Sequence, residues 1–166
     1  MHEPLKQPVS LAQYLEAMSQ AGLQAGISWR VVEAKWPGIV KAFKGFDPAK
    51  VAKFSGEDID NLMQNPEVIR NRAKLESIVL NARRLLELDK AHGTFRNYLK
   101  SLGSFENQLA GLHKDFKFLG ESGAYYFLWH VGEKVPDWQE WEDRHTAEAG
   151  KGTMPRRTKR KAGAGT

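Results

Sequence analysis

Residues 20–29 have the sequence QAGLQAGISW, and the predicted fold is arranged around this segment. One helical pattern ends in a glycine here, and the next begins at Ser28, whose side-chain oxygen is suited to cap a helix. Glycine at position 26 lets backbone approach another group closely, and Trp29 offers a large flat stacking surface. These features suit a site for a base. They are also those of an ordinary corner between two helices, which the segment taken alone favours.

Apolar residues recur with helical spacing through most of the chain. Ser10 and Gln13 form a capping box before a helix over residues 10–21, and the most regular apolar stripe predicts a long core helix over 72–88. Other helices are predicted from 28 with a restart at Pro37, after 47, from 55, around 95–99, over 109–114, after 123 and from 138, with a loop over 101–108. Neither a strand pattern nor a repeat is evident, so the sequence predicts an all-α fold.

The totals limit the domain organisation and the compartment. A chain of 166 residues with 41% hydrophobic residues can bury one core, and we expect an N-terminal extension over 1–9, one helical domain over 10–149 and a disordered tail over 150–166. Without cysteine, disulfides and thiolate metal sites are excluded. No signal sequence or bilayer-spanning segment is found, so a cytoplasmic protein that does not enter a membrane is expected.

The net charge of +5 comes from the tail. Residues 150–166 hold six of the 25 lysines and arginines and none of the 20 acidic residues, so the rest of the chain is close to neutral. A case for DNA binding must therefore depend on local patches, while the tail would attract phosphate without reading sequence. A tail that only keeps the protein soluble is an equally good interpretation.

Two local features suit phosphate. Glycines at 120 and 123, around Ser122 and beside Lys117, predict a helix-hairpin-helix turn whose backbone N–H groups can seat a phosphate, although a plain helix corner has the same pattern. Arg70, Arg72 and Lys74 form a basic patch at the start of the long helix. Such a patch is usually a solvated face, but basic residues are disfavoured at a helix N-terminus, which makes a phosphate contact more attractive.

Several classes of site are absent from the sequence. The histidines show no metal-ligand spacing, and we find no phosphate-binding loop, dinucleotide fingerprint or serine nucleophile elbow, so we predict neither a metal nor a cofactor. Most tryptophans are expected in the core. Trp29 and Trp36 are the two candidates for stacking, because both lie near the corner.

Four motifs in one order resemble the DNA-3-methyladenine glycosylase I family from about residue 11 to residue 138. They are QAGISW at 24–29, FDPAKVA at 46–52, IRNRAKL at 69–75 with Asn81-Ala82-Arg83, and FKFLG at 116–120 with Tyr125 and Phe127. The resemblance implies a helix-hairpin-helix glycosylase that bends double-stranded DNA, flips a damaged nucleotide out and hydrolyses the bond between base and sugar.

The resemblance also implies roles for individual residues. Trp29 is expected to stack on the flipped purine and Ile27 to fill the gap left in the duplex, with Gly26 allowing the backbone to approach. Gln24, Trp36 and Tyr125 are further candidates for the substrate pocket. An alkylated adenine is a cation, which aromatic rings attract and which is already a good leaving group.

The chain departs from the family in three places. The family's N-terminal segment, with a cysteine and pocket aromatics, has no counterpart. Trp138 stands where the family has a histidine, and no cysteine follows, so the zinc clasp of the family is not expected. The family's pocket glutamate corresponds to Ala21, with only Gln20 beside it.

Two carboxylates are candidates to replace that glutamate: Glu121 at the hairpin and Asp137 on the loop after the hairpin's second helix. Asp137 is the better one, because the wider superfamily places its catalytic aspartate on this loop. A purely structural role, in which Asp137 caps the helix carrying Trp138 and Trp141, is favoured slightly over catalysis.

The leading hypothesis is a monomeric, metal-free DNA glycosylase for alkylated purines, without lyase activity because no lysine stands out as a Schiff-base nucleophile. The alternative is a catalytically inactive relative that binds DNA lesions or abasic sites. A third interpretation is a helical interaction domain that no longer binds DNA.

Overall fold

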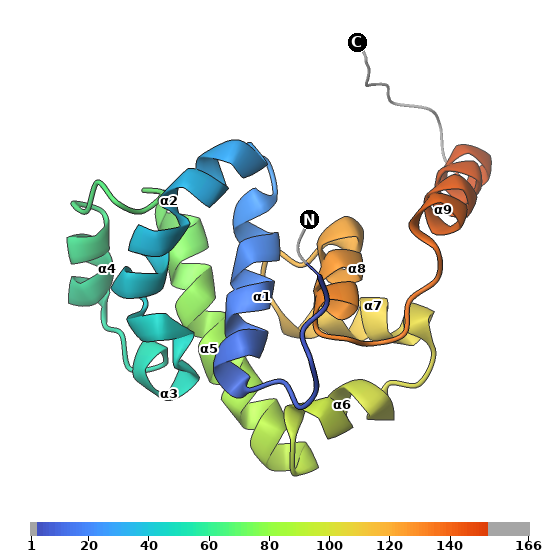
Figure 1. Ribbon diagram of the computed structural model, residues 1–166, viewed down its shortest axis with the longest axis horizontal. Helices are drawn as coiled ribbons and strands as arrows, with labels where there is room; N and C mark the ends of the chain where they lie inside the picture. Colours follow the sequence, from blue (N-terminus) through green and yellow to red (C-terminus); the bar gives the residue numbers. More distant parts are fainter. Residues whose placement is uncertain (1–2, 153–166) are drawn as a thin grey trace. The chain divides into compact units, whose positions relative to one another are not determined.

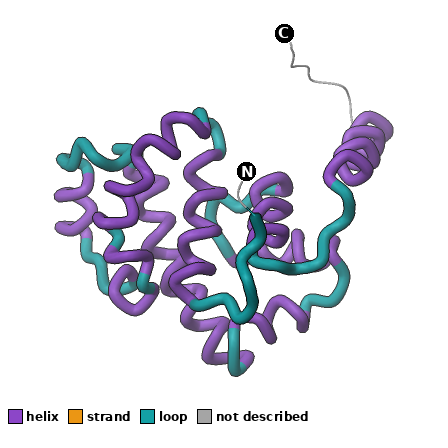
Figure 2. The backbone as a smooth tube through the Cα atoms, in the orientation of Figure 1, coloured by secondary structure: helices purple, strands orange, loops and turns teal. Residues whose placement is uncertain are grey.

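The computed structural model describes residues 3–152, and within this range it contains helices and no strand, which confirms the all-α prediction (Figures 1 and 2). None of these helices is long and apolar enough to cross a membrane. Residues 153–166, most of the predicted basic tail, lie outside the described part. The helices are α1 (Leu11–Gln24), α2 (Trp29–Ala42), η1 (Lys44–Phe46), α3 (Pro48–Val51), α4 (Gly56–Leu62), α5 (Arg72–His92), α6 (Phe95–Ser101), α7 (Phe105–Asp115), α8 (Glu121–His130) and α9 (Trp138–Gly152).

The chain divides into two compact units, Met1–Lys134 and Val135–Thr166. The first unit contains α1 to α8, and the second contains α9. The predicted domain boundary at 149 falls inside α9. The residues that line the cavity described below all belong to the first unit.

The core of the first unit forms where α1 packs against both α5 and α8 (Figure 1). The helices α1 and α5 each contribute one apolar stripe, as the spacing of their residues predicts, and α8 is apolar on most of its surface. Their contacting side chains are almost fully buried: Leu15, Met18, Leu23, Leu75, Ile78, Leu85, Phe127 and Leu128. Burying each such side chain stabilises the fold by about 1.5–3 kcal/mol.

Side-chain caps start most of the helices, as the sequence predicts. Ser10 and Ser55 form capping boxes with Gln13 and Asp58, and Asp47 accepts from the Ala49 N–H ahead of α3. Ser28 is a predicted cap that does not form, because its side chain makes no capping hydrogen bond in the structure. Its backbone carbonyl instead accepts from Val31 and Val32.

Three predicted boundaries are wrong. The first helix does not end at Gly22, because this buried glycine lies within α1 against the α7–α8 turn, where an added Cβ would come 3.4 Å from the Cβ of Phe118. Pro37 does not restart a helix, since α2 runs through it on an exposed face where water can satisfy the freed carbonyl. Residues 101–108 are not one loop, because Ser104 caps α7.

The segment before α1 is bound to the end of α8. The Leu5 N–H donates to the His130 carbonyl at 2.7 Å, and the Gln7 side-chain amide donates to the Val131 carbonyl at 2.7 Å. These carbonyls belong to the C-terminal end of α8 and have no helical partner of their own. The N-terminal segment therefore completes the end of that helix.

Candidate functional site

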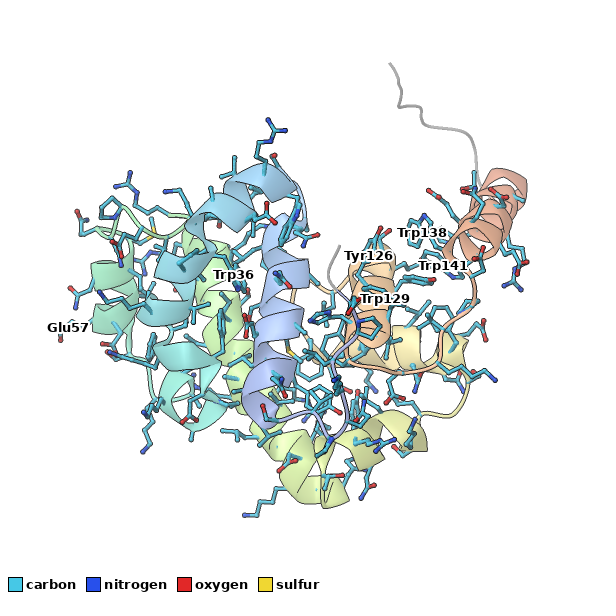
Figure 3. All side chains as sticks on the ribbon, viewed as in Figure 1. Trp36, Glu57, Tyr126, Trp129, Trp138 and Trp141 are labelled. Carbon is cyan, nitrogen blue, oxygen red and sulfur yellow. The ribbon has the colours of Figure 1, made fainter. Side chains whose placement is uncertain are left out.

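A cavity of about 270 Å³ lies between α1, the start of α2 and α8. Its lining includes four aromatic side chains of phenylalanine, tyrosine and tryptophan, together with two glutamines and one histidine. Figure 3 labels two of the aromatic side chains, Tyr126 and Trp129, on α8. The lining residues are Ala17, Gln20, Ala21, Gln24, Trp29, Tyr126, Phe127, Trp129 and His130.

Helical periodicity places these residues on the cavity. The four from α1 follow the spacing i, i+3, i+4 and i+7, which is one face of a helix, and the four from α8 follow i, i+1, i+3 and i+4. The small side chains of Ala17 and Ala21 leave the space that the aromatic rings surround. The cavity is thus a gap between two packed helices, with Trp29 at its edge.

The corner between α1 and α2 carries Trp29 to this edge. Gly26 has a φ of +79°, a conformation that suits glycine, and nothing lies within 4 Å of where its Cβ would be. The Ile27 N–H donates to the Gln24 carbonyl at 3.1 Å, which closes the turn, and α2 then begins at Trp29. Ile27 is half-buried and Gly26 is exposed. The structure therefore brings together Gln24 and Trp29, as the sequence predicts, with Gly26 and Ile27 on the turn beside them.

Lys74 of α5 is hydrogen-bonded to this corner. Its ammonium donates to the Gly22 carbonyl at 2.8 Å and also to the Ala25 carbonyl, and the side chain is buried. Burial lowers the pKa of Lys74. A cation at the C-terminal end of a helix satisfies its last carbonyls. The predicted phosphate contact by Lys74 is corrected on these grounds, because the ammonium is engaged inside the protein.

The other two residues of the predicted basic patch differ in their surroundings. Arg72 pairs with Asp60 and lies 3.7 Å from Glu76, so its charge is neutralised locally. The hydrogen bond that Arg72 donates to Asp60 leads the causes that raise the pKa of Arg72. Arg70 is exposed, and no described residue forms an ion pair or hydrogen bond with its side chain. Of the three residues of the basic patch, Arg70 is therefore the one whose charge no described residue compensates.

The turn between α7 and α8 has the expected hairpin form. Both its helices belong to the first unit, and Gly120 is the N-cap of α8. The N–H groups of Ser122 and Gly123 lie in the first helical turn, before any carbonyl of α8 can accept them. Lys117 is exposed on the turn. Gly120, Ser122 and Gly123 therefore lie at the N-terminal end of α8, with Lys117 on the turn before it.

Trp36 and Tyr125 do not line the cavity. The Trp36 indole N–H donates to Glu16 at 2.8 Å, and its ring stacks on Phe46 at 5.5 Å between centroids. Tyr125 is buried and meets Phe105 of α7 edge to face, while Tyr126 is the tyrosine that faces the cavity. Both predicted substrate contacts are corrected, the second by one residue of helical register.

Of the described residues that line the cavity, none is acidic. Ala21 lies in the wall where the family resemblance places a glutamate. Glu121 is the exposed first residue of α8 and is not part of the lining. Asp137 belongs to the second unit, where its carboxylate accepts from the Glu140 N–H at 3.2 Å at the start of α9. This contact is the capping role weighed against catalysis.

Sequence reasoning did not assign five of the lining residues to the site: Ala17, Tyr126, Phe127, Trp129 and His130. The signal for Ala17 was its spacing from Gln20, Ala21 and Gln24. No comparable signal existed on α8, because this segment is apolar nearly all round and its cavity face cannot be told from its core face by periodicity.

Comparison with known proteins gives consistent results. Residues 7–115 match the family model for methyladenine glycosylase. The DNA-3-methyladenine glycosylase of Haemophilus influenzae is 34% identical, with 70% of this chain and 75% of that protein covered. The DNA-3-methyladenine glycosylase 1 of Escherichia coli K12 is also 34% identical, with 70% and 74% covered.

Solved structures agree with these relatives. The 3-methyladenine DNA glycosylase I of Staphylococcus aureus has a TM-score of 0.68 at 29% identity, with 78% of this chain and 79% of that chain covered. A 3-methyladenine DNA glycosylase I in complex with 3-methyladenine has a TM-score of 0.66 at 29% identity, with 76% and 80% covered.

Proposed function

Since the chain belongs to the methyladenine glycosylase family, we propose that it is a DNA glycosylase that removes alkylated purines such as 3-methyladenine after flipping the nucleotide out of the duplex. The observation that carries this proposal is the aromatic cavity beside Trp29. The protein would act as a cytoplasmic monomer, without a metal or cofactor and without lyase activity.

The cavity suits a flat cationic base. Trp29, Tyr126 and Trp129 line the cavity, and a cation placed over the face of such a ring gains about 0.5–2 kcal/mol. Gln20 and Gln24 carry amides that can donate to and accept from ring nitrogens. An undamaged neutral purine would lose the cation–π term and be held less tightly.

The chemistry follows from the charge of the lesion. When the bond between the sugar C1′ and the base nitrogen breaks, its electron pair neutralises the positive ring, so the base leaves without being protonated. Water then attacks C1′ and gives up a proton. The protein has to orient that water and stabilise the developing oxocarbenium charge, which a carboxylate does well. Asp137 and Glu121 are the candidates for this role.

DNA would be held on both sides of the cavity. Ile27 is the apolar residue that fills the space left by the flipped nucleotide, and exposed Gly26 lets the duplex come close. The hairpin of Lys117, Gly120, Ser122 and Gly123 would bind one phosphate. Arg70 adds a second cationic contact, while Arg72 contributes less because Asp60 and Glu76 compensate its charge.

The test measures the release of base from DNA that contains 3-methyladenine. The reaction is run under single-turnover conditions, and the free base is detected by chromatography. We expect release by the wild type, a loss of at least about 100-fold in Asp137→Asn, the better candidate, and a smaller loss in Glu121→Gln. If the wild type releases no base, the enzymatic proposal is overturned.

A second candidate function is binding of lesions or abasic sites without catalysis. The absence of an acidic side chain among the described lining residues favours it. This function predicts preferential binding to an abasic duplex that survives Asp137→Asn and fails with Ile27→Gly. Binding that is absent, or that does not weaken with salt, would indicate a domain that no longer uses DNA.

A further inference from the structure

We infer that Lys74 and Asn81 are positioning residues, which fix the distance between the Gly22–Ile27 corner and the Phe116–Gly120 hairpin by tying both to α5. The inference rests on the proposed function, because it concerns the two turns assigned there to DNA. Neither residue touches the cavity, so both would act through the segments that they hold.

The first tie is Lys74. A buried ammonium is costly, and here two carbonyls at the end of α1 compensate it, Gly22 at 2.8 Å and Ala25. A core position alone would be filled better by an apolar side chain. The gain from lysine is that the last turn of α1 and the start of the corner are held at one place along α5.

The second tie is Asn81. Its side-chain amide donates to the Lys117 carbonyl at 3.1 Å, and its side-chain oxygen accepts from the Lys117 N–H at 2.8 Å. The donor and the acceptor of the Asn81 side-chain amide are thus both used by the backbone of one hairpin residue, Lys117. A pairing of this kind fixes orientation as well as distance, because either bond would break if the turn rotated.

The two ties lie on the same face of α5. They are seven residues apart, which is close to two helical turns and a rise of about 10.5 Å. An α-helix is stiff over this length, so the corner and the hairpin are set at a fixed spacing. The helix α5 thus contacts the corner through Lys74 and the hairpin through Asn81.

Phe118 closes the arrangement between the two turns. The ammonium of Lys74 lies 5.0 Å from the centroid of the Phe118 ring, and an added Cβ at Gly22 would come 3.4 Å from the Phe118 Cβ. The φ of Phe118 is +59°, a strained conformation for a phenylalanine. The hairpin therefore rests on the corner directly as well as through α5.

The functional consequence is a division of labour. If the corner becomes more mobile, the hairpin should still bind a phosphate, but Ile27 should insert less well and Trp29 should stack less well. Loosening the hairpin should weaken binding to any duplex. The spacing matters most when both turns must engage at once, which is the flipped state.

The experiment measures binding to an undamaged duplex and to an abasic-site duplex by fluorescence anisotropy. We expect Lys74→Met to leave undamaged-duplex affinity within about 2-fold and to weaken abasic-site binding by about 10-fold or more, because both hydrogen bonds from its ammonium to the corner are lost. Lys74→Arg should restore part of the loss. Asn81→Leu should weaken binding to both duplexes.

Ile78→Ala is the matched control, since Ile78 is buried on α5 between the two ties and bonds to neither turn. It destabilises the core without cutting a tie, and all variants are compared at a temperature where each is folded. If Lys74→Met binds both duplexes as Ile78→Ala does, while the wild type prefers the abasic duplex, the inference fails and the proposed function stands. If the wild type binds neither duplex, both fail.

Hydrogen exchange gives a readout without DNA. Lys74→Met should speed exchange at residues 22–29 and Asn81→Leu at residues 116–120, each by more than Ile78→Ala does. In the variant that carries both Lys74→Met and Asn81→Leu, the increase in exchange should exceed the sum of the increases in the two single variants, because Phe118 couples the turns. Uniform acceleration across the unit in every variant would overturn the inference.

Discussion

Tyr98 donates its hydroxyl hydrogen to Asp115 at 2.6 Å, and Arg84 donates to the same carboxylate at 2.6 Å. These bonds join α6, α5 and the last residue of α7, just ahead of the hairpin. Burial alone would raise the pKa of Asp115, but the hydrogen bonds from Tyr98 and Arg84 outweigh it, and the pKa is lowered below 3.8.

A lowered carboxyl pKa makes stability depend on acid pH. The contribution of Asp115 is fully present above the unfolded pKa of 3.8 and is lost as pH falls through the folded value, because the unfolded chain binds the proton first. We expect urea unfolding to show a stability advantage of the wild type over Asp115→Asn that is constant near neutral pH and shrinks below about pH 4. Asp60→Asn, an exposed ion-pair residue, should show a much smaller difference.

Two buried tyrosines should respond differently to loss of the hydroxyl. Tyr98→Phe leaves Asp115 without one of its donors and should cost about 1–3 kcal/mol. Tyr14→Phe should be neutral or stabilising near pH 7, because no described residue hydrogen-bonds the Tyr14 hydroxyl. Chemical denaturation of both variants checks this, and a larger loss for Tyr14→Phe than for Tyr98→Phe would contradict it.

Tyr14 should also make the stability of the protein depend on alkaline pH. Burial first, and then the charge of Glu133, raise the pKa of Tyr14 to about 12 against an opposing effect of Arg96. Above pH 10 the unfolded chain releases a proton that the folded chain retains, so the wild type loses stability there. Tyr14→Phe should flatten this decline. Unfolding midpoints measured between about pH 9 and 11 provide the comparison.

Trp29 and Trp36 should separate binding from stability. Trp29→Ala removes a cavity wall at the end of a helix, so lesion binding should fall by about 10- to 100-fold with little change in melting temperature. Trp36→Ala removes the stack on Phe46 and the bond to Glu16, so it should cost about 2–4 kcal/mol and leave lesion affinity within about 2-fold. If Trp36→Ala instead lost lesion affinity and Trp29→Ala lost stability, the base-binding site would lie at Trp36.

Ala21→Glu should create or strengthen base release. The new carboxylate would enter the cavity wall at the position where the family has its glutamate, and it would face the cationic base. We expect release from DNA containing 3-methyladenine to rise by about 10-fold or more, with Gln20→Glu, one residue away in the same wall, as the control. Equal rates for both variants would indicate a general effect of charge rather than a specific position.

The predictable part of the molecule depends on local signals. Ser10, Ser55 and Asp47 reveal helix starts because a capping side chain and its acceptor lie within three residues of each other. Trp29 was identified because the corner before it is also local. The all-α class followed from the same short-range periodicity.

The parts that were wrong depend on distant contacts. Lys74 looks like a surface lysine until Gly22 and Ala25, about fifty residues earlier, supply its acceptors. Tyr125 and Tyr126 are equally aromatic, and only the packing of α8 on α1 decides which one faces the cavity. Gly22 resembles a helix stop, although its role is close packing against Phe118.

The binding of Leu5 and Gln7 to the end of α8 has a practical consequence. His130, whose carbonyl accepts from Leu5, also lines the cavity. Gln7 bonds to Val131, the next residue, which is 124 positions away in the sequence. The segment ahead of α1 therefore supports the cavity wall. A shortened version starting at Ser10 would fold its helices and still lose affinity for a base. Expression tags and truncations at this end should therefore be treated as mutations of the cavity.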